Sequence, residues 1–142
     1  MEYRKFNESY ILRLDPGEEV VASIGRLTEL EDIVLASVQG IGAADEVTVG
    51  IFQTKEKEYQ SRTYNGAFEI TNIGGNITRK DGQPYLHLHI TIGDPMSGIC
   101  VGGHLTRAVI SATAEIIVTT ISGNVDREYS ADIGLNIFKF QG

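Results

Sequence analysis

The three histidines of the chain, His87, His89 and His104, have the residue type and spacing of a metal-binding set. Apolar and polar residues alternate from Tyr85 to Ile92, which predicts a β-strand. Successive side chains of a strand point to opposite faces, so His87 and His89 share one face, with Cα atoms about 6.6–7 Å apart. At this spacing both imidazoles can reach one metal ion through bonds of about 2.0–2.1 Å.

The third histidine follows a predicted turn. Asp94-Pro95 and Gly98 indicate a chain reversal, after which a second strand would bring His104 back beside the first pair. Three imidazoles with an open fourth position are the ligand set of a catalytic-type zinc site. The alternatives are a structural metal, a site for a small ligand without metal, or solvated imidazoles on a polar face, since a short motif also arises by chance.

Two carboxylates interrupt apolar runs and have two interpretations. Glu69 lies between Phe68 and Ile70, and Glu115 precedes a run of branched apolar residues. On a strand each would point to the polar, solvent-facing side. Otherwise each could orient a metal-bound histidine or act on a metal-bound water.

Length and composition indicate one ordinary globular domain, residues 1–142, with a sizeable core. The net charge of −7 argues against direct DNA binding, because neutralising phosphates requires clustered lysine and arginine. The single cysteine, Cys100, excludes an intrachain disulfide, and its apolar neighbours predict a buried, inert thiol. With no apolar signal segment and no run of membrane-spanning length, we expect a cytoplasmic protein without a membrane partner.

Most of the chain is predicted to form short strands around one helix. Residues 15–19 resemble a helix start, with Asp15 as the cap, and the helix should run to about Leu30. Asn65-Gly66 and Asp81-Gly82 both predict hairpin turns. The glycine-rich residues 40–44 are expected to link two strands, and residues 126–132 to form a polar connection before a last strand.

Several segments, in this order along nearly the whole chain, resemble the PPC domain, the "plants and prokaryotes conserved" domain also called DUF296. They are Gly17-Glu18-Glu19, Gln39-Gly40-Ile41-Gly42-Ala43, Gly66-Ala67-Phe68-Glu69-Ile70, Gly75-Asn76-Ile77, Asp81-Gly82, Leu86-His87-Leu88-His89 and Gly102-Gly103-His104-Leu105. The resemblance implies an α+β fold, a mostly antiparallel, barrel-like sheet with one main helix packed on it. It also implies a homotrimer.

The family's plant members carry an AT-hook, whose Arg-Gly-Arg-Pro core enters the minor groove of DNA. No such stretch occurs in this sequence. The resemblance therefore implies a stand-alone, homotrimeric regulatory module that associates with DNA at most indirectly and carries a three-histidine metal site.

At the level of fold the domain also resembles acetolactate decarboxylase, a zinc enzyme whose metal is held by a His-x-His pair and a third histidine. Only His87, His89 and His104 match this ligand set; Glu69, Arg107 and Glu115 are candidates for its other catalytic groups. This resemblance implies the alternative function, a small zinc-dependent lyase or hydrolase acting on an oxo- or hydroxy-acid. Whether the chain is an enzyme is left open by the sequence.

Overall fold

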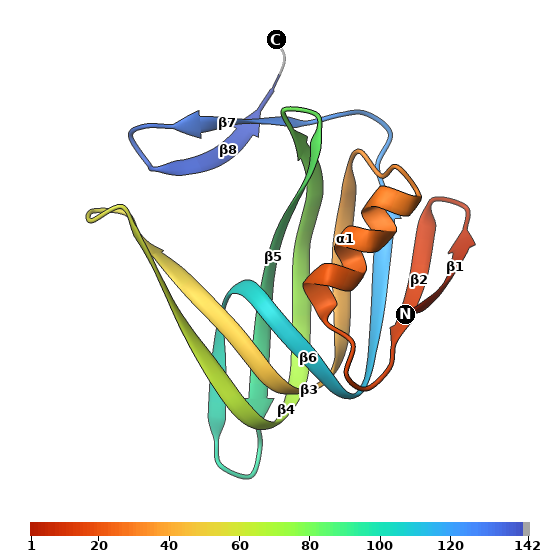
Figure 1. Ribbon diagram of the computed structural model, residues 1–142, viewed down its shortest axis with the longest axis vertical. Helices are drawn as coiled ribbons and strands as arrows, with labels where there is room; N and C mark the ends of the chain where they lie inside the picture. The colour runs from red at the N-terminus through yellow and green to blue at the C-terminus, as the bar shows by residue number, and fades with distance from the viewer. Residues whose placement is uncertain (141–142) are drawn as a thin grey trace.

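The computed structural model describes residues 1–140 and is dominated by antiparallel strands (Figure 1). In chain order the elements are β1 (Glu2–Phe6), β2 (Ser9–Leu14), α1 (Val20–Leu30), β3 (Ala36–Gln53), β4 (Glu58–Lys80), β5 (Gln83–Asp94), β6 (Ile99–Thr120), β7 (Asp126–Ser130) and β8 (Leu135–Lys139). The predicted α+β class, a mostly antiparallel sheet with one main helix, is confirmed.

The six strands β1 to β6 form one sheet that closes on itself. Their order is β1-β2-β6-β3-β4-β5, and the first residues of β6 also pair with β5. All pairings are antiparallel. Strand β6 thus joins both ends of the β3-β4-β5 array, and the histidines lie on the strands that make this closure.

Strands β3 and β4 continue through positions where the sequence predicted a link or a turn. The pairing of β3 with β4 shifts register between Gly40 and Gly42 and again between Ala44 and Glu46, so the expected link at residues 40–44 is continuous strand with bulges. The predicted hairpin at Asn65-Gly66 is also wrong: Asn65 lies within β4, opposite Glu46. The chain reverses instead at residues 54–57, where Lys57 has a φ of 55°. Asp81-Gly82 forms the turn that its sequence predicts.

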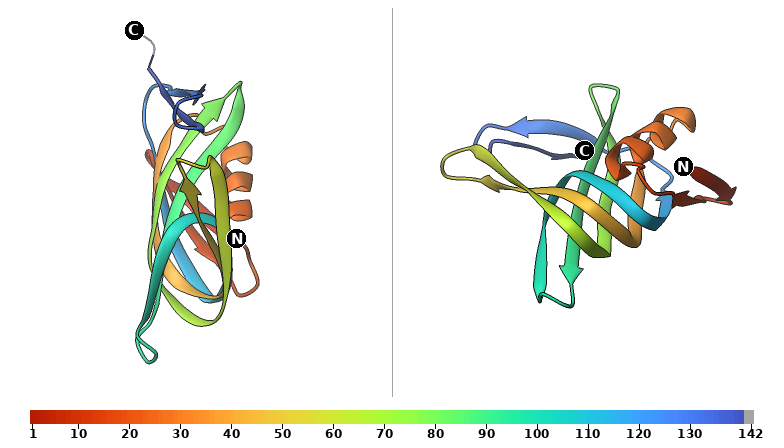
Figure 2. Two further views of the ribbon diagram at one scale, coloured as in Figure 1. Left: turned by 90° about the vertical axis from the view of Figure 1, so that its left-hand side faces the viewer. Right: turned by 60° about the horizontal axis from the view of Figure 1, so that its bottom comes forward.

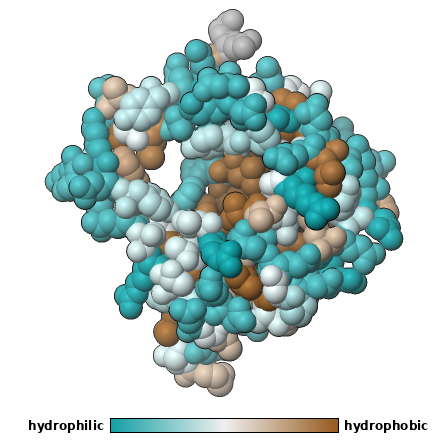
Figure 3. All heavy atoms as spheres, viewed as in Figure 1, coloured by the Kyte–Doolittle hydropathy of each residue, from teal (hydrophilic) through white to brown (hydrophobic). Residues whose placement is uncertain are grey.

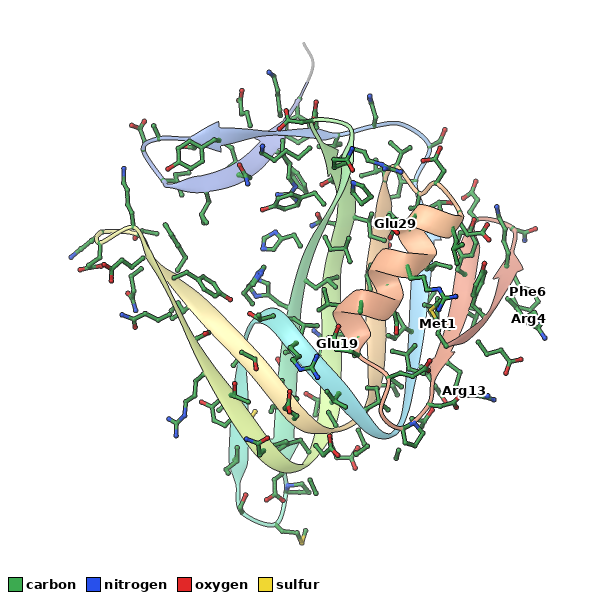
Figure 4. All side chains as sticks on the ribbon, in the orientation of Figure 1. Met1, Arg4, Phe6, Arg13, Glu19 and Glu29 are labelled. Carbon is green, nitrogen blue, oxygen red and sulfur yellow. The ribbon has the colours of Figure 1, made fainter. Side chains whose placement is uncertain are left out.

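The helix packs on one face of the sheet, as the side view in Figure 2 shows. Its inward stripe, Val20, Ser23, Ile24, Leu27 and Thr28, has the spacing of one helical face. The cap is Glu19 rather than the expected Asp15, and the side chain of Glu19 accepts the N–H groups of Val21 (3.0 Å) and Ala22 (2.6 Å) (Figure 4). Asp15 is not the cap because the helix begins only at Val20, and the Glu19 carboxylate also accepts the N–H of Ala108 on β6 (3.0 Å), which ties the helix to the sheet.

A second, two-stranded sheet consists of β7 and β8, where the sequence predicted a polar connection before one strand. This C-terminal hairpin lies beside the free end of the β3–β4 hairpin (Figure 1). Lys57 donates to the carbonyl of Ala131, and Gly134 lies against the ring of Phe52. Within residues 1–140, no helix is long and apolar enough to cross a membrane.

Candidate metal centre

The β5–β6 hairpin places the three histidines. Asp94 closes its turn by accepting the N–H of Met96 (2.9 Å), and the N–H of Gly98 bonds back to the Asp94 carbonyl (2.9 Å). The resulting register sets His89 directly opposite His104. Directly opposed residues have Cβ atoms about 4.5–5.5 Å apart, and His87 lies two residues away on the same face.

The three rings converge on one point. Their centroids are 5.2 Å apart for His87 and His89, 5.5 Å for His87 and His104, and 5.7 Å for His89 and His104. One nitrogen from each ring lies within 4.8 Å of the other two. Zinc–nitrogen bonds of about 2.0–2.1 Å in a tetrahedral arrangement bring ligand nitrogens to about 3.4 Å, so modest side-chain rotations would suffice to close the set around an ion.

The core behind β5 fixes the direction in which the histidines point. Leu88 and Ile90 alternate with them and are 2% and 1% exposed. Because the strand period is two, burying these side chains turns His87 and His89 to the opposite face. His87 and His104 are half-buried there, while His89 is exposed.

Two glycines make room for close contacts around the cluster. A Cβ atom on Gly75 would come within 2.0 Å of the His87 carbonyl oxygen, so β4 and β5 approach at this level only without a side chain. A Cβ atom on Gly50, which pairs with His104, would come within 2.0 Å of the Tyr59 hydroxyl. Tyr59 occupies that space; its ring meets the His104 ring edge-on at 5.7 Å, and its hydroxyl hydrogen-bonds Thr106 (3.2 Å).

The environment favours neutral imidazoles. Burial lowers the pKa of His87, and the positive charge of Arg127 and the neighbouring histidines lower it further. Burial, followed by the proximity of His89, lowers the pKa of His104. A neutral ring offers the lone pair that a metal ion needs.

Arg127 and Tyr59 are residues of this site that the sequence analysis missed. Arg127 lies on β7 and donates to Asn76 Oδ1 (2.7 Å), and Asn76 is the register partner of His87. Its contact depends on a hairpin folding back over β4 and β5, for which the sequence carries no local signal. Figure 3 shows the molecule hollowed between that hairpin and the β3–β4 hairpin.

The other candidate residues lie elsewhere. Glu69 and Glu115 are exposed, as their positions in alternating strands predict, and each lines a surface groove to which no histidine contributes. Arg107 pairs with Glu46 on β3 (2.6 Å). None of the three joins the histidine cluster.

The prediction that Cys100 is buried is wrong, because its side chain is exposed. It stands second in β6, at the end of the β5–β6 hairpin that projects beyond the body of the sheet (Figure 1). Apolar neighbours in the sequence therefore do not imply burial at this position.

The closed antiparallel sheet, its single helix and the three-histidine cluster define a small α+β protein with a candidate metal site. The family model of the Plants and Prokaryotes Conserved (PCC) domain matches residues 1–122, and the chain belongs to this family. The resemblance to the PPC domain is thus confirmed. The β7–β8 hairpin lies beyond the matched residues.

Solved structures show the same fold. A "putative DNA-binding protein" from Bacteroides thetaiotaomicron is 35% identical, with a TM-score of 0.94 over 98% of this chain and 96% of that chain. A metal-containing protein from Archaeoglobus fulgidus is 29% identical, with a TM-score of 0.88 over 98% and 97%. α-Acetolactate decarboxylase from Bacillus subtilis, at 12% identity and a TM-score of 0.57 over 87% and 57%, shares the fold alone. None of the curated proteins matches the chain.

Proposed function

We propose that the protein binds one zinc ion through His87, His89 and His104 and leaves the fourth coordination position open to an exchangeable small ligand. The convergence of three imidazole nitrogens within 4.8 Å of one another carries this proposal. The lowered pKa values of His87 and His104 support it, because both rings are neutral near pH 7. The similarity to a metal-containing archaeal protein agrees with it.

Such a site suits a small zinc-dependent lyase or hydrolase acting on an oxo- or hydroxy-acid. Zinc with an open position polarises a carbonyl or lowers the pKa of a bound water toward about 7. The chain's own contribution is to hold three imidazole donors on one face and to set the half-exposed ring of Tyr59 edge-on against His104. No carboxylate belongs to the cluster within residues 1–140, so a general base is not part of the proposal.

Alanine substitution of single histidines tests this function. We expect His87→Ala and His104→Ala each to lower zinc affinity at least tenfold relative to the unmodified protein. Ser111→Ala is the matched control, since Ser111 is exposed on the same strand as His104 without belonging to the cluster. Full zinc affinity in both histidine variants would refute the assignment.

We also propose that the chain assembles as a homotrimer through an apolar groove lined mainly by β1, β2, β3 and β6, to which no histidine contributes. The groove has a volume of about 690 Å³ and is lined by Phe6, Ile11, Ile41 and Ile117, all of them 37–61% exposed. Figure 4 shows Phe6 and Arg4 on β1 and Arg13 on the neighbouring β2, and all three residues line the groove. Exposed apolar patches of this kind mark interaction surfaces.

Light scattering of the unmodified protein and of Ile117→Glu tests the assembly. We expect a trimer that dissociates when the glutamate is introduced. An unmodified protein that is monomeric at micromolar concentration would refute this part of the proposal.

We propose that any regulatory role of the protein at DNA runs through a partner and not through direct contact with the DNA. Although relatives are described as putative DNA-binding proteins, the net charge of −7 opposes phosphate contact. We expect no mobility shift of duplex DNA at low salt with micromolar protein, and a shift that disappears with added salt would show direct binding instead.

A further inference from the structure

Arg127 is a buried cation whose partners are all neutral. It is 6% exposed. Its Nε donates to Thr78 Oγ1 (2.8 Å), Nη1 to the Asn136 carbonyl (3.1 Å) and Nη2 to Asn76 Oδ1 (2.7 Å). The adjacent Asp126 carboxylate accepts the backbone N–H of Arg127 instead (2.9 Å). In the described part of the chain no carboxylate forms an ion pair with this guanidinium.

This isolated charge lies next to the histidine cluster. The guanidinium is sandwiched between the rings of Tyr85 (4.3 Å) and Phe138 (4.6 Å). Tyr85 precedes His87 by two residues on the same face of β5, and Asn76 is the register partner of His87. The arginine therefore contacts two side chains, those of Tyr85 and Asn76, that are neighbours of the proposed zinc ligand His87.

Burying a charge without a counter-charge is costly, and proteins normally pair such groups. Arg79, on the same strand as Asn76, shows the usual arrangement: its guanidinium pairs with the carboxylate of Asp32 at 2.8 Å. At the metal site, three neutral imidazoles would leave both charges of a divalent ion uncompensated. Together with Arg127, the site would carry three positive charges and no carboxylate from the cluster.

We propose that the exchangeable ligand of the metal is a small carboxylate. Arg127 is then a specificity-determining residue: its positive charge attracts the negative charge of the ligand without contacting it. The inference rests on the proposed zinc site and names the chemical class that the site takes. At 6% exposure the guanidinium acts through the field of its charge. As a general magnitude, a unit charge about 10 Å from an anion, at an effective dielectric constant of about 20, changes the affinity for that anion by roughly tenfold.

The experiment uses full-length protein loaded with Co²⁺, whose visible spectrum reports ligand exchange at the open position. Acetate and neutral imidazole are titrated separately at pH 8. The key variant is Asn76→Asp, which keeps the acceptor for Arg127 Nη2 but supplies the missing negative charge. Arg127→Gln removes the charge, Arg127→Lys retains it, and Arg79→Gln is the matched control.

We expect Asn76→Asp and Arg127→Gln to weaken acetate binding at least tenfold while imidazole binding changes less than twofold. Arg127→Lys and Arg79→Gln should leave acetate binding within about threefold of the unmodified protein. If Arg127 only anchors the C-terminal hairpin, Arg127→Lys will weaken acetate binding as much as Arg127→Gln does, and this result overturns the inference. Acetate binding that Asn76→Asp leaves unchanged overturns it too. Equal losses for acetate and imidazole overturn it as well. Unmodified protein that fails to bind Co²⁺ refutes the zinc site itself, which is a separate and recognisable failure.

Discussion

Replacing Gly75 with alanine perturbs the metal site through the backbone, without touching a ligand. The new Cβ atom would lie 2.0 Å from the carbonyl oxygen of His87 and 2.9 Å from the Cα atom of Leu88. Both neighbours are backbone atoms, so no side-chain rotation can relieve the contact. Strand β5 must move away from β4 at the residue that presents His87.

The size of this movement follows from the contact distance. Real Cβ contacts essentially never fall below 3.0 Å, whereas this contact would be 2.0 Å. Strands β4 and β5 must therefore move apart by at least 1.0 Å at this level. Metal–ligand distances tolerate only about ±0.2 Å. We therefore expect zinc affinity to fall about 10–100-fold, the range found when the support of a ligand is disturbed. Overpacking should also cost about 1–3 kcal/mol of unfolding free energy.

Competition with a chromogenic chelator measures the zinc affinity, and thermal unfolding of the metal-free protein measures stability. Gly93→Ala is the matched control, because Gly93 lies on β5 itself and its added Cβ would meet only the Ile99 carbonyl oxygen at an ordinary 3.5 Å. The reasoning fails if folded Gly75→Ala protein binds zinc as tightly as the Gly93→Ala variant.

Three further predictions concern pH, the core and the helix cap. Because the pKa values of His87 and His104 are lowered by burial, the unfolded chain binds more protons as pH falls below about 6.5; metal-free protein should lose stability there and keep it above, which denaturant titrations at several pH values would show. Leu88→Ala, behind the histidine face, should cost about 2–5 kcal/mol in urea unfolding, and a loss below 1 kcal/mol would contradict the packing described. Glu19→Ala should cost about 1–2 kcal/mol from the lost helix cap, and more if the Ala108 N–H stays unpaired, whereas Glu29→Ala, on the exposed side of the helix, should be nearly neutral by the same measurement.

The strand that carries the histidines was predictable because its two faces differ. Leu88 and Ile90 are buried and their neighbours are not, so the alternation of the sequence reports the strand directly. The Asp81-Gly82 turn was predictable because it ends two long strands that pair with each other. In these places local preference and tertiary structure agree.

Elsewhere, long-range pairing decided the structure. Asn65-Gly66 has the composition of a turn, yet it pairs with β3 in the middle of a long strand, so the ladder overrides the local preference. Residues 126–130 became a strand only because residues 135–139 fold back on them. Arg127 could not be assigned to the site from sequence, because its partners Thr78 and Asn76 lie far away in the chain on β4.

X-ray absorption spectroscopy of zinc-loaded protein, with the zinc content of the same sample measured, tests the central claim most directly. The account predicts one zinc per chain, bound by three imidazole nitrogens at about 2.0–2.1 Å and one further oxygen or nitrogen atom. A sulfur ligand at about 2.3 Å, which the exposed Cys100 would supply, or fewer than three imidazoles, would contradict it.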